Sequence, residues 1–313
     1  MTIDLVTLGE AMGLLTPTEP GPLLRRPLLR LGFGGAETNL AIGAARLGLR
    51  THWIGRVGDD EIGDLILREL RAEGVAVSCV RDTAPTGLMF KTVGAAGQVR
   101  VTYLRSASAG SRLCPGDVDE TLIREAKVLH VTGITPALGA DPAAAVTAAV
   151  EIARANRVVV SLDLNYRSAL WDPRTAKAAL GPLVKQADVL FATHDEAQLL
   201  VNADTPADCA RVLSSLGPRQ VMVKLGAAGS VSVVDGELYR RDAETVTVVD
   251  PVGAGDAFAA GYLSDLVHGA DARAGLSTAT RAGAFAVTVS GDWEGLPTRA
   301  ELHAFERRGD VVR

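Results

Sequence analysis

The stretch Val249–Tyr262, with the sequence VDPVGAGDAFAAGY, organises the chain. A β-rich run over residues 244–249 ends at a proline turn, and a helix is predicted to begin at Gly255 with Asp256 in its first turn. The first amides of a helix have no partner within it, and the helix dipole adds positive potential there. Glycines at 253 and 255 let the backbone approach an anion closely, so the loop suits phosphoryl oxygens. Asp256 would then lie beside the atom that attacks phosphorus, where a general base is needed.

The plainer interpretation of this stretch is an ordinary strand–turn–helix with an N-terminal Asp, which stabilises helices in any case. Four coinciding features favour a catalytic role: the Asp-Pro turn, Gly-x-Gly, the Asp directly after it and a helix face of small residues. The stretch closely resembles the C-terminal signature of the ribokinase-like (PfkB) sugar kinases. The resemblance implies that Asp256 is the catalytic base and that Gly253, Ala254 and Gly255 donate the hydrogen bonds of an anion hole.

Composition excludes several classes of protein. The chain has 313 residues, 47% of them hydrophobic and 22% charged, which is ordinary for a soluble globular protein. Its net charge of −5 and the absence of a long Lys/Arg run argue against a nucleic-acid partner. Cys79, Cys114 and Cys209 form no CxxC pair, which argues against a disulfide framework or a zinc site and fits a reducing cytosol. No signal peptide and no apolar run of about 18 residues are present, so we expect no membrane partner and a cytoplasmic protein.

Apolar runs that alternate with helical segments predict the fold class. Strands bounded by helices, each strand a continuous apolar run, imply a mainly parallel sheet covered on both faces. We therefore expect an α/β protein, and the resemblance specifies a ribokinase-like three-layer αβα sandwich. Strands are expected at 3–9, 51–57, 128–131, 158–162, 189–191 and 221–223, and helices at 37–47, at 61–73, and after N-caps at Asp141 and Asp172.

Two segments, about 11–33 and 86–106, interrupt this alternation of strands and helices. The first is rich in proline, and the second has two β-like runs around residues 94–97, a hairpin signal. The alternative is that both are long surface loops, but the strict alternation from residue 99 to 105 favours strands. We expect a single domain over residues 1–313, with the two segments forming a small β-sheet lid inserted in it.

A second signature lies near the N-terminus, in the run FGGAETNLA at residues 33–41. Its double glycine allows close approach to a ligand, and with GRVGDD at 55–60 it resembles the N-terminal signature of the same kinase family. The resemblance spans the whole chain and is greatest to the 2-keto-3-deoxygluconate kinases, on YLR at 103–105, GITPAL at 133–138, SLDLNYR at 161–167 and GDWEG at 291–295. It implies a sugar-acid pocket formed by Gly34, Gly35, Ala36, Glu37, Thr38, Asn39, Met89, Tyr103, Leu104, Arg105, Ile134, Arg167, Asp256 and Asp292.

The chemistry of a sugar acid agrees with this pocket. An arginine fork binds a carboxylate with two hydrogen bonds, and Arg167 follows the strand at 158–162, where open α/β sheets bind ligands. Arg105 would reach in from the lid, although either arginine could instead form a surface salt bridge. Met89 stands where the family usually has a tyrosine, so the exact sugar and its stereochemistry stay open.

The run KLGAAGS at 224–230 is a tight turn after an apolar strand, a common feature by itself, and the resemblance implies that this turn contacts the nucleotide. The resemblance implies ATP and Mg²⁺ as cofactors, with the metal held through water by Glu196, and it leaves open a monovalent cation such as K⁺ near Asp250. The nucleotide-binding residues it implies are Asn165, Thr193, Glu196, Lys224, Gly226, Ala227, Gly229, Gly253, Ala254, Gly255, Ala279 and Thr280, with Gly283 and Ala284 shaping the adenine slot.

These observations predict an ATP-dependent sugar kinase that phosphorylates the terminal hydroxyl of 2-keto-3-deoxygluconate. No Gly-Lys dipeptide is present, so there is no Walker A loop, and no G-x-G-x-x-G follows the first strand. A ribokinase or fructokinase activity on a neutral sugar is the close alternative, and a non-catalytic sugar-binding protein is the alternative from another class. Because exposed lid edges invite pairing, we expect a homo-oligomer, a dimer or higher, formed through the lid.

Overall fold

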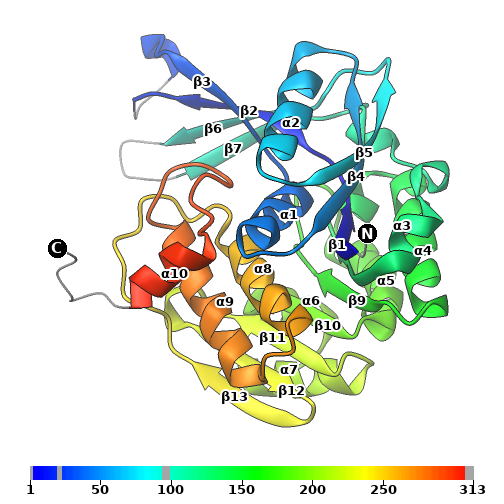
Figure 1. The fold of residues 1–313 in the computed structure, drawn as a ribbon, viewed down its shortest axis with the longest axis vertical. Helices are drawn as coiled ribbons and strands as arrows, with labels where there is room; N and C mark the ends of the chain where they lie inside the picture. The colour runs from blue at the N-terminus through cyan, green and yellow to red at the C-terminus, as the bar shows by residue number, and fades with distance from the viewer. Residues whose placement is uncertain (1–2, 20–22, 94–98, 307–313) are drawn as a thin grey trace.

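The computed structural model describes residues 3–19, 23–93 and 99–306, and a nine-stranded sheet forms its centre (Figure 1). The strands of this sheet are β1 (Ile3–Leu8), β4 (Thr51–Gly58), β5 (Ala76–Asp82), β8 (Ala126–Thr132), β9 (Val159–Asp163), β10 (Val189–Thr193), β11 (Gln220–Lys224), β12 (Ser230–Val234) and β13 (Glu237–Arg241). Their order is β13-β12-β11-β10-β9-β8-β1-β4-β5. All neighbours from β11 to β5 run parallel, and only β12 and β13 are antiparallel. The carboxyl ends of seven strands therefore meet at one edge.

Helices cover both faces of this sheet. The chain alternates sides along each strand, as β10 shows: Leu190 packs into one core and Phe191 into another. One face is covered by α3 (Glu120–Glu125), α4 (Ala140–Ala155), α5 (Pro173–Gln186), α6 (His194–Leu200) and α7 (Pro206–Ser215). The other is covered by α1 (Ala36–Arg46), α2 (Glu61–Ala72), α8 (Ala254–Val267), α9 (Ala272–Ala286) and α10 (Arg299–Glu306). Short 3₁₀ turns occur at Leu23–Arg25, Gly110–Arg112, Pro115–Asp117, Thr135–Leu138 and Gly226–Ala228.

A second sheet projects from the body at the upper left of Figure 1. We call it the lid sheet; its strands are β2 (Met12–Pro17), β3 (Leu29–Gly34), β6 (Leu88–Val93) and β7 (Val99–Leu104). The order is β3-β2-β6-β7, with β2 and β6 parallel and the outer pairs antiparallel. Met12, Leu14 and Met89 form a small buried core on it, packed against Val101. The lid sheet therefore has an inward face that packs and lines a cavity described below.

The predicted fold class is confirmed: the protein is an α/β sandwich with a mostly parallel sheet and a small second sheet. The strands and helices expected between residues 3 and 73 and from 128 to 223 are present, and both runs that flank 94–97 are strands. The hairpin turn expected at 94–97 lies outside the described residues. Asp172 caps α5 as expected, with its carboxylate accepting from two amides of the first turn.

Three local predictions were wrong. Residues 244–249 form no strand, because β13 is the edge of the sheet and the chain beyond it has no ladder partner. Asp141 is not an N-cap, because α4 begins one residue earlier, at Ala140, with Gly139 as its cap. Helix α8 likewise begins at Ala254 rather than at Gly255.

Candidate active site

A cavity of about 900 Å³ lies where the carboxyl ends of the parallel strands face the lid sheet. Glu10 follows β1, Asp163 ends β9, Thr193 ends β10 and Lys224 ends β11, and all four line the cavity. The first turns of α1 and α8 and the lid strands β6 and β7 complete the wall. This is the place at which open parallel sheets bind ligands, because loops from neighbouring strands diverge there.

Most of the predicted site residues line this one cavity. They are Gly35, Ala36, Glu37, Asn39, Met89, Tyr103, Arg105, Ile134, Asn165, Arg167, Thr193, Glu196, Lys224, Gly226, Ala227, Gly229, Gly253, Ala254, Gly255, Asp256, Thr280 and Asp292, together with Gly283 and Ala284 of the expected adenine slot. Residues that are more than 200 positions apart in sequence thus share one wall.

Four of the predicted residues lie outside the cavity lining. Gly34 lies behind Asp292, whose carboxylate would clash with any β-carbon at that position. Thr38 is fully buried, and its hydroxyl donates to a carbonyl of its own helix turn. Leu104 is 58% exposed, and Ala279 is buried in the contact between α8 and α9.

The loop before α8 has the conformation that its glycines allow. Gly253 is the N-cap residue of α8 and has φ of +80°, in the left-handed region. A β-carbon there would lie 2.2 Å from the carbonyl oxygen of Asp292, so both the backbone angle and the space require glycine. Residues 253–256 line the cavity, and the first amides of a helix have no intrahelical partner.

Asp256, in the first turn of α8, is held beside α1. Its Oδ2 accepts a hydrogen bond of 2.9 Å from Nδ2 of Asn39. Burial raises the pKa of Asp256 to about 7, and the negative charge of Asp163 also raises it, against the Asn39 hydrogen bond and the positive charges of Lys224 and Arg167. A carboxylate with a pKa near neutrality is suited to take up and release a proton at physiological pH.

Lys224 lies between the ends of β9 and β11 and residues 253–255, the predicted anion-hole loop. Its Nζ donates to Oδ2 of Asp163 at 2.6 Å, and the β-carbon position of Gly255 is 3.3 Å from the same nitrogen. Burial lowers the pKa of Lys224, but the charges of Asp163, Glu196 and Asp256, together with the hydrogen bond to Asp163, raise it overall. The lysine is therefore a fixed positive charge beside the loop.

Glu196 combines a structural role with a place in the cavity wall. Its Oε2 accepts from the amide of Thr193 in a capping box, and its Oε1 accepts from the amide of Tyr166. Each oxygen has capacity for a further hydrogen bond, so Glu196 could accept from a water molecule of a hydrated Mg²⁺. Within the described residues no three His, Cys, Asp or Glu side chains form a group that could hold a metal ion.

The two arginines differ in their surroundings. Arg105 has a side chain that is 10% exposed and forms an ion pair with the buried carboxylate of Glu10. Arg167 is exposed to the cavity, and no ion pair connects it to another described residue. Arg167 therefore has the guanidinium that is free to meet an incoming carboxylate.

Sequence reasoning missed several residues that line the cavity. Glu10 could have been found from its position directly after the first strand, and Asp163 from its place in the segment 161–167 at a strand end. The segment from Ala243 to Val248 also lines the cavity, together with Val287. The β-branched residues of this segment were interpreted as a strand. The same residue types also occur in extended chain that lines a cavity without pairing in a sheet.

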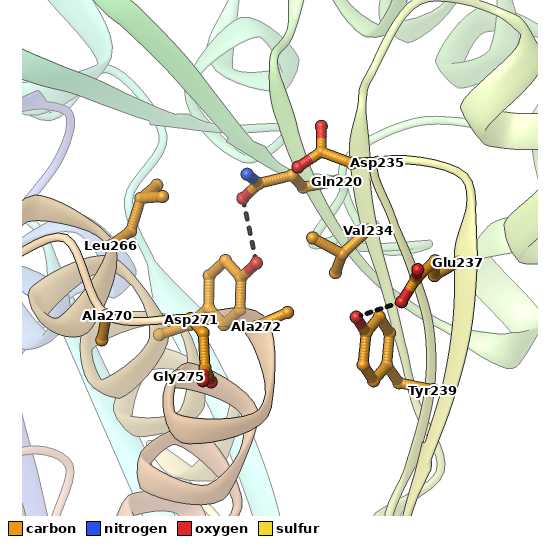
Figure 2. A pocket seen from close by; sticks show the side chains of 11 residues that line it. Gln220, Val234, Asp235, Glu237, Tyr239, Leu266, Ala270, Asp271, Ala272 and Gly275 are labelled. Atoms are coloured by element: carbon orange, nitrogen blue, oxygen red, sulfur yellow. Dashed lines mark hydrogen bonds between the residues drawn. The ribbon is translucent and has the colours of Figure 1, made fainter.

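A second cavity, of about 470 Å³, lies elsewhere (Figure 2). Gln220 begins β11 and Val234 ends the antiparallel β12, so the cavity is at the amino ends of the parallel strands. The hydroxyl of Tyr262 donates to Oε1 of Gln220 at 2.9 Å, and that of Tyr239 donates to Glu237 at 2.8 Å, so these polar groups are satisfied. The two cavities share no lining residue.

The fold and the first cavity combine a glycine-rich helix start, a buried carboxylate beside it and a β-sheet over the pocket, an arrangement that fits the class of sugar kinases. The family model described as "pfkB family carbohydrate kinase" matches residues 2–299 of this chain. The chain therefore belongs to this family. The predicted family is thereby confirmed.

Relatives in the family are similar over nearly their whole length. A Bacillus subtilis 2-dehydro-3-deoxygluconokinase is 37% identical over 97% of this chain and 96% of its own. A 2-dehydro-3-deoxygluconokinase of Thermoproteus tenax is 40% identical over 96% and 93%. The solved structure of a putative ribokinase II from E. coli in complex with ATP and Mg²⁺ superposes with a TM-score of 0.91 at 28% identity, covering 98% of this chain and 99% of that one. In the described part of the chain, no helix has the length and apolarity to cross a bilayer.

Proposed function

We propose that the protein transfers the γ-phosphoryl group of ATP to the terminal primary hydroxyl of 2-keto-3-deoxygluconate, the sugar acid also called 2-dehydro-3-deoxygluconate. The observation that carries the proposal is the position of Asp256, which lines one cavity with the Gly253–Gly255 loop and with Arg167. The two relatives that bear this activity in their names, and their near-complete overlap with this chain, support the sugar acid as the substrate.

In the proposed reaction, Asp256 accepts the proton of the sugar hydroxyl. The hydroxyl oxygen forms a bond to the γ-phosphorus, the bond from that phosphorus to the bridging oxygen breaks, and ADP leaves with the electron pair. The amides of residues 253–255 and the ammonium of Lys224 stabilise the charge on the transferring group. A positioned base contributes about 10²- to 10⁴-fold and an anion-hole donor about 10²- to 10³-fold to the rate.

The nucleotide occupies the side of the cavity formed by β11, α9 and the segment 243–248. Thr280 and Gly283 of α9 and the apolar Val246 and Val287 line this side of the cavity, and we assign them to the adenine. Glu196 would hold Mg²⁺ through water, and the metal would neutralise charge on the phosphates when bound. The turn at Gly226–Gly229 approaches the nucleotide with its backbone.

The sugar acid lies under the lid sheet. Arg167 binds the carboxylate with its free guanidinium, and Arg105, paired with Glu10, orients the lid side of the pocket. Met89 and Tyr103 pack against the apolar face of the carbon chain. A neutral sugar would leave the guanidinium of Arg167 without a carboxylate partner in the pocket, which favours a sugar acid over ribose and fructose.

A panel of substrates tests the proposal. ADP release is measured with 2-keto-3-deoxygluconate, its galactonate epimer, ribose and fructose at several concentrations each. We expect the highest kcat/KM with a sugar acid. Faster turnover of ribose or fructose than of either acid would reject the sugar-acid assignment, and binding without turnover of any of them would favour the non-catalytic alternative.

We further propose a single domain over residues 1–313 that acts in the cytoplasm as a homo-oligomer through the lid sheet. Leu29 and Leu31 on β3 and Leu104 on β7 are exposed apolar side chains on that sheet, and burying them against a second copy removes apolar surface from water. Light scattering after size-exclusion chromatography measures the mass of the assembly. The substitution Leu31→Glu is expected to dissociate it.

A further inference from the structure

Lys91 is a buried lysine whose position the proposed reaction leaves unexplained. It belongs to β6 of the lid sheet, two residues after Met89, and its side chain is 3% exposed. Its Nζ lies 2.5 Å from Oδ2 of Asp250, 3.3 Å from the carbonyl oxygen of Gly291 and 3.5 Å from Oδ1 of Asp292. An ammonium that is taken out of water requires such partners, so its place is determined by two other segments of the chain.

Those two segments form the back of the anion-hole loop. Oδ1 of Asp250 accepts from the amide of Val252, and its Oδ2 accepts from the amide of Gly291. The carbonyl of Asp292 packs against Gly253, the N-cap of α8. The Asp250 carboxylate therefore joins the loop before α8 to the loop after α9, and Lys91 neutralises it from the lid.

A monovalent cation near Asp250 does not fit this arrangement. A metal ion would need the carboxylate and carbonyl oxygens that the ammonium of Lys91 already contacts, and it would bring a second positive charge within a few ångströms of the first. The oxygen set around Lys91 is itself the kind that hard cations prefer. The ammonium thus fills the position that a bound ion would take.

We propose that Lys91 is a built-in cation that positions the anion-hole loop and ties it to the lid sheet, so that the kinase needs no monovalent metal ion there. The inference rests on the proposed role of residues 253–255 in binding phosphate. Lys91 is a positioning residue, since it contacts Asp250, Gly291 and Asp292 rather than the reacting atoms. Its removal leaves two buried carboxylates side by side and lets the loop shift, and a misplacement of about 1 Å can cost about 10²-fold in rate.

The test compares wild type, Lys91→Met and the exposed-lysine control Lys177→Met in choline, potassium and methylammonium chloride at equal ionic strength. Wild type and the control are expected to have the same kcat in all three salts. Lys91→Met is expected to lose about 10²-fold in kcat in choline and to recover at least about tenfold when methylammonium or potassium can enter the vacated position. A structural role alone would not give this rescue.

Three results would overturn the inference: stimulation of wild type by potassium over choline, a Lys91→Met enzyme with full kcat in choline, or a folded but inactive variant that no small cation restores. Melting temperatures in the same salts give a second measurement that does not depend on the substrate. Potassium should raise the melting temperature of Lys91→Met and leave that of wild type unchanged. If no sugar turns over, the proposed function fails, whereas these melting temperatures still decide the role of Lys91.

Discussion

The hydrogen bond from Asn39 to Asp256 makes the pH profile of the enzyme a sharp test of the proposed base. Asp256 must be ionised to accept a proton, and its pKa is raised to about 7, chiefly by burial. We therefore expect kcat/KM of wild type to rise with pH through about 7 and to reach a plateau above it. One pH unit below the pKa the ionised fraction, and with it the rate, is about tenfold below the plateau.

Asn39→Ala removes a donor that stabilises the ionised form of Asp256. A hydrogen bond to a charged group contributes about 1.5–3 kcal/mol, and about 1.4 kcal/mol corresponds to one pKa unit, so the pKa should rise by about one to two units. The acid limb of the variant is then expected at about pH 8–9. The sign follows from the direction of the bond: loss of a donor to the carboxylate favours the protonated form.

The assay must not depend on pH-sensitive coupling enzymes, so the reaction is quenched and ADP is quantified by chromatography from pH 5 to pH 10. Circular dichroism at each pH confirms that the variant is folded, and Asn156→Ala, which removes an exposed helix-end side chain, is the matched control. An acid limb of Asn39→Ala at or below that of wild type would refute the reasoning. A wild-type profile that is flat down to pH 5 would remove Asp256 as the titrating base.

Three further predictions concern single residues. Asp256→Asn should lower kcat by at least about 10²-fold and leave the Kd for ATP nearly unchanged by calorimetry, and a wild-type rate would exclude its role as base. Arg167→Ala should raise KM for the sugar acid by about 10- to 100-fold with little effect on a neutral sugar, in steady-state kinetics; an equal effect on both would argue against carboxylate binding. Gly253→Ala should destabilise the protein more than Gly74→Ala in urea unfolding, because both have φ near +80° but only Gly253 faces a carbonyl, that of Asp292. If the two variants lost the same free energy of unfolding, the destabilisation would come from the backbone angle alone.

The sequence predicted the parallel sheet and the position of the site for one physical reason: each depends on local signals. Apolar runs of strand length, and glycines at the starts of two helices, indicate their own structure without knowledge of distant residues. Asp256 and Asn39 could thus be assigned to one pocket, and the structure joins them by a hydrogen bond. The same locality explains the wrong strand at 244–249, since a β-rich segment forms a strand only where a neighbour is available.

Ion pairing between distant segments could not be predicted in this way. Arg105 lines the cavity as expected, but no local pattern identifies its ion-pair partner Glu10, which is 95 residues earlier in the chain. Lys91 gave no signal at all, because a lysine on a β-strand ordinarily faces solvent. Such partners depend on how the lid sheet packs against the body, which no local pattern in the sequence specifies.

The ion pair between Lys224 and Asp163 explains how Asp256 can lie buried near a lysine and still have a raised pKa. If Lys224 contacted Asp256 directly, the attraction would hold the pKa of this carboxylate low, and it would be a weak base at neutral pH. Instead Lys224 donates to Asp163 at 2.6 Å, so its charge is largely matched by a different carboxylate. Asp163 adds repulsion to burial at Asp256, while the lysine still lies beside the amides of the anion-hole loop. One ion pair at the ends of β9 and β11 thus serves both halves of the proposed reaction: it keeps the base proton-accepting and keeps a positive charge beside the phosphoryl group.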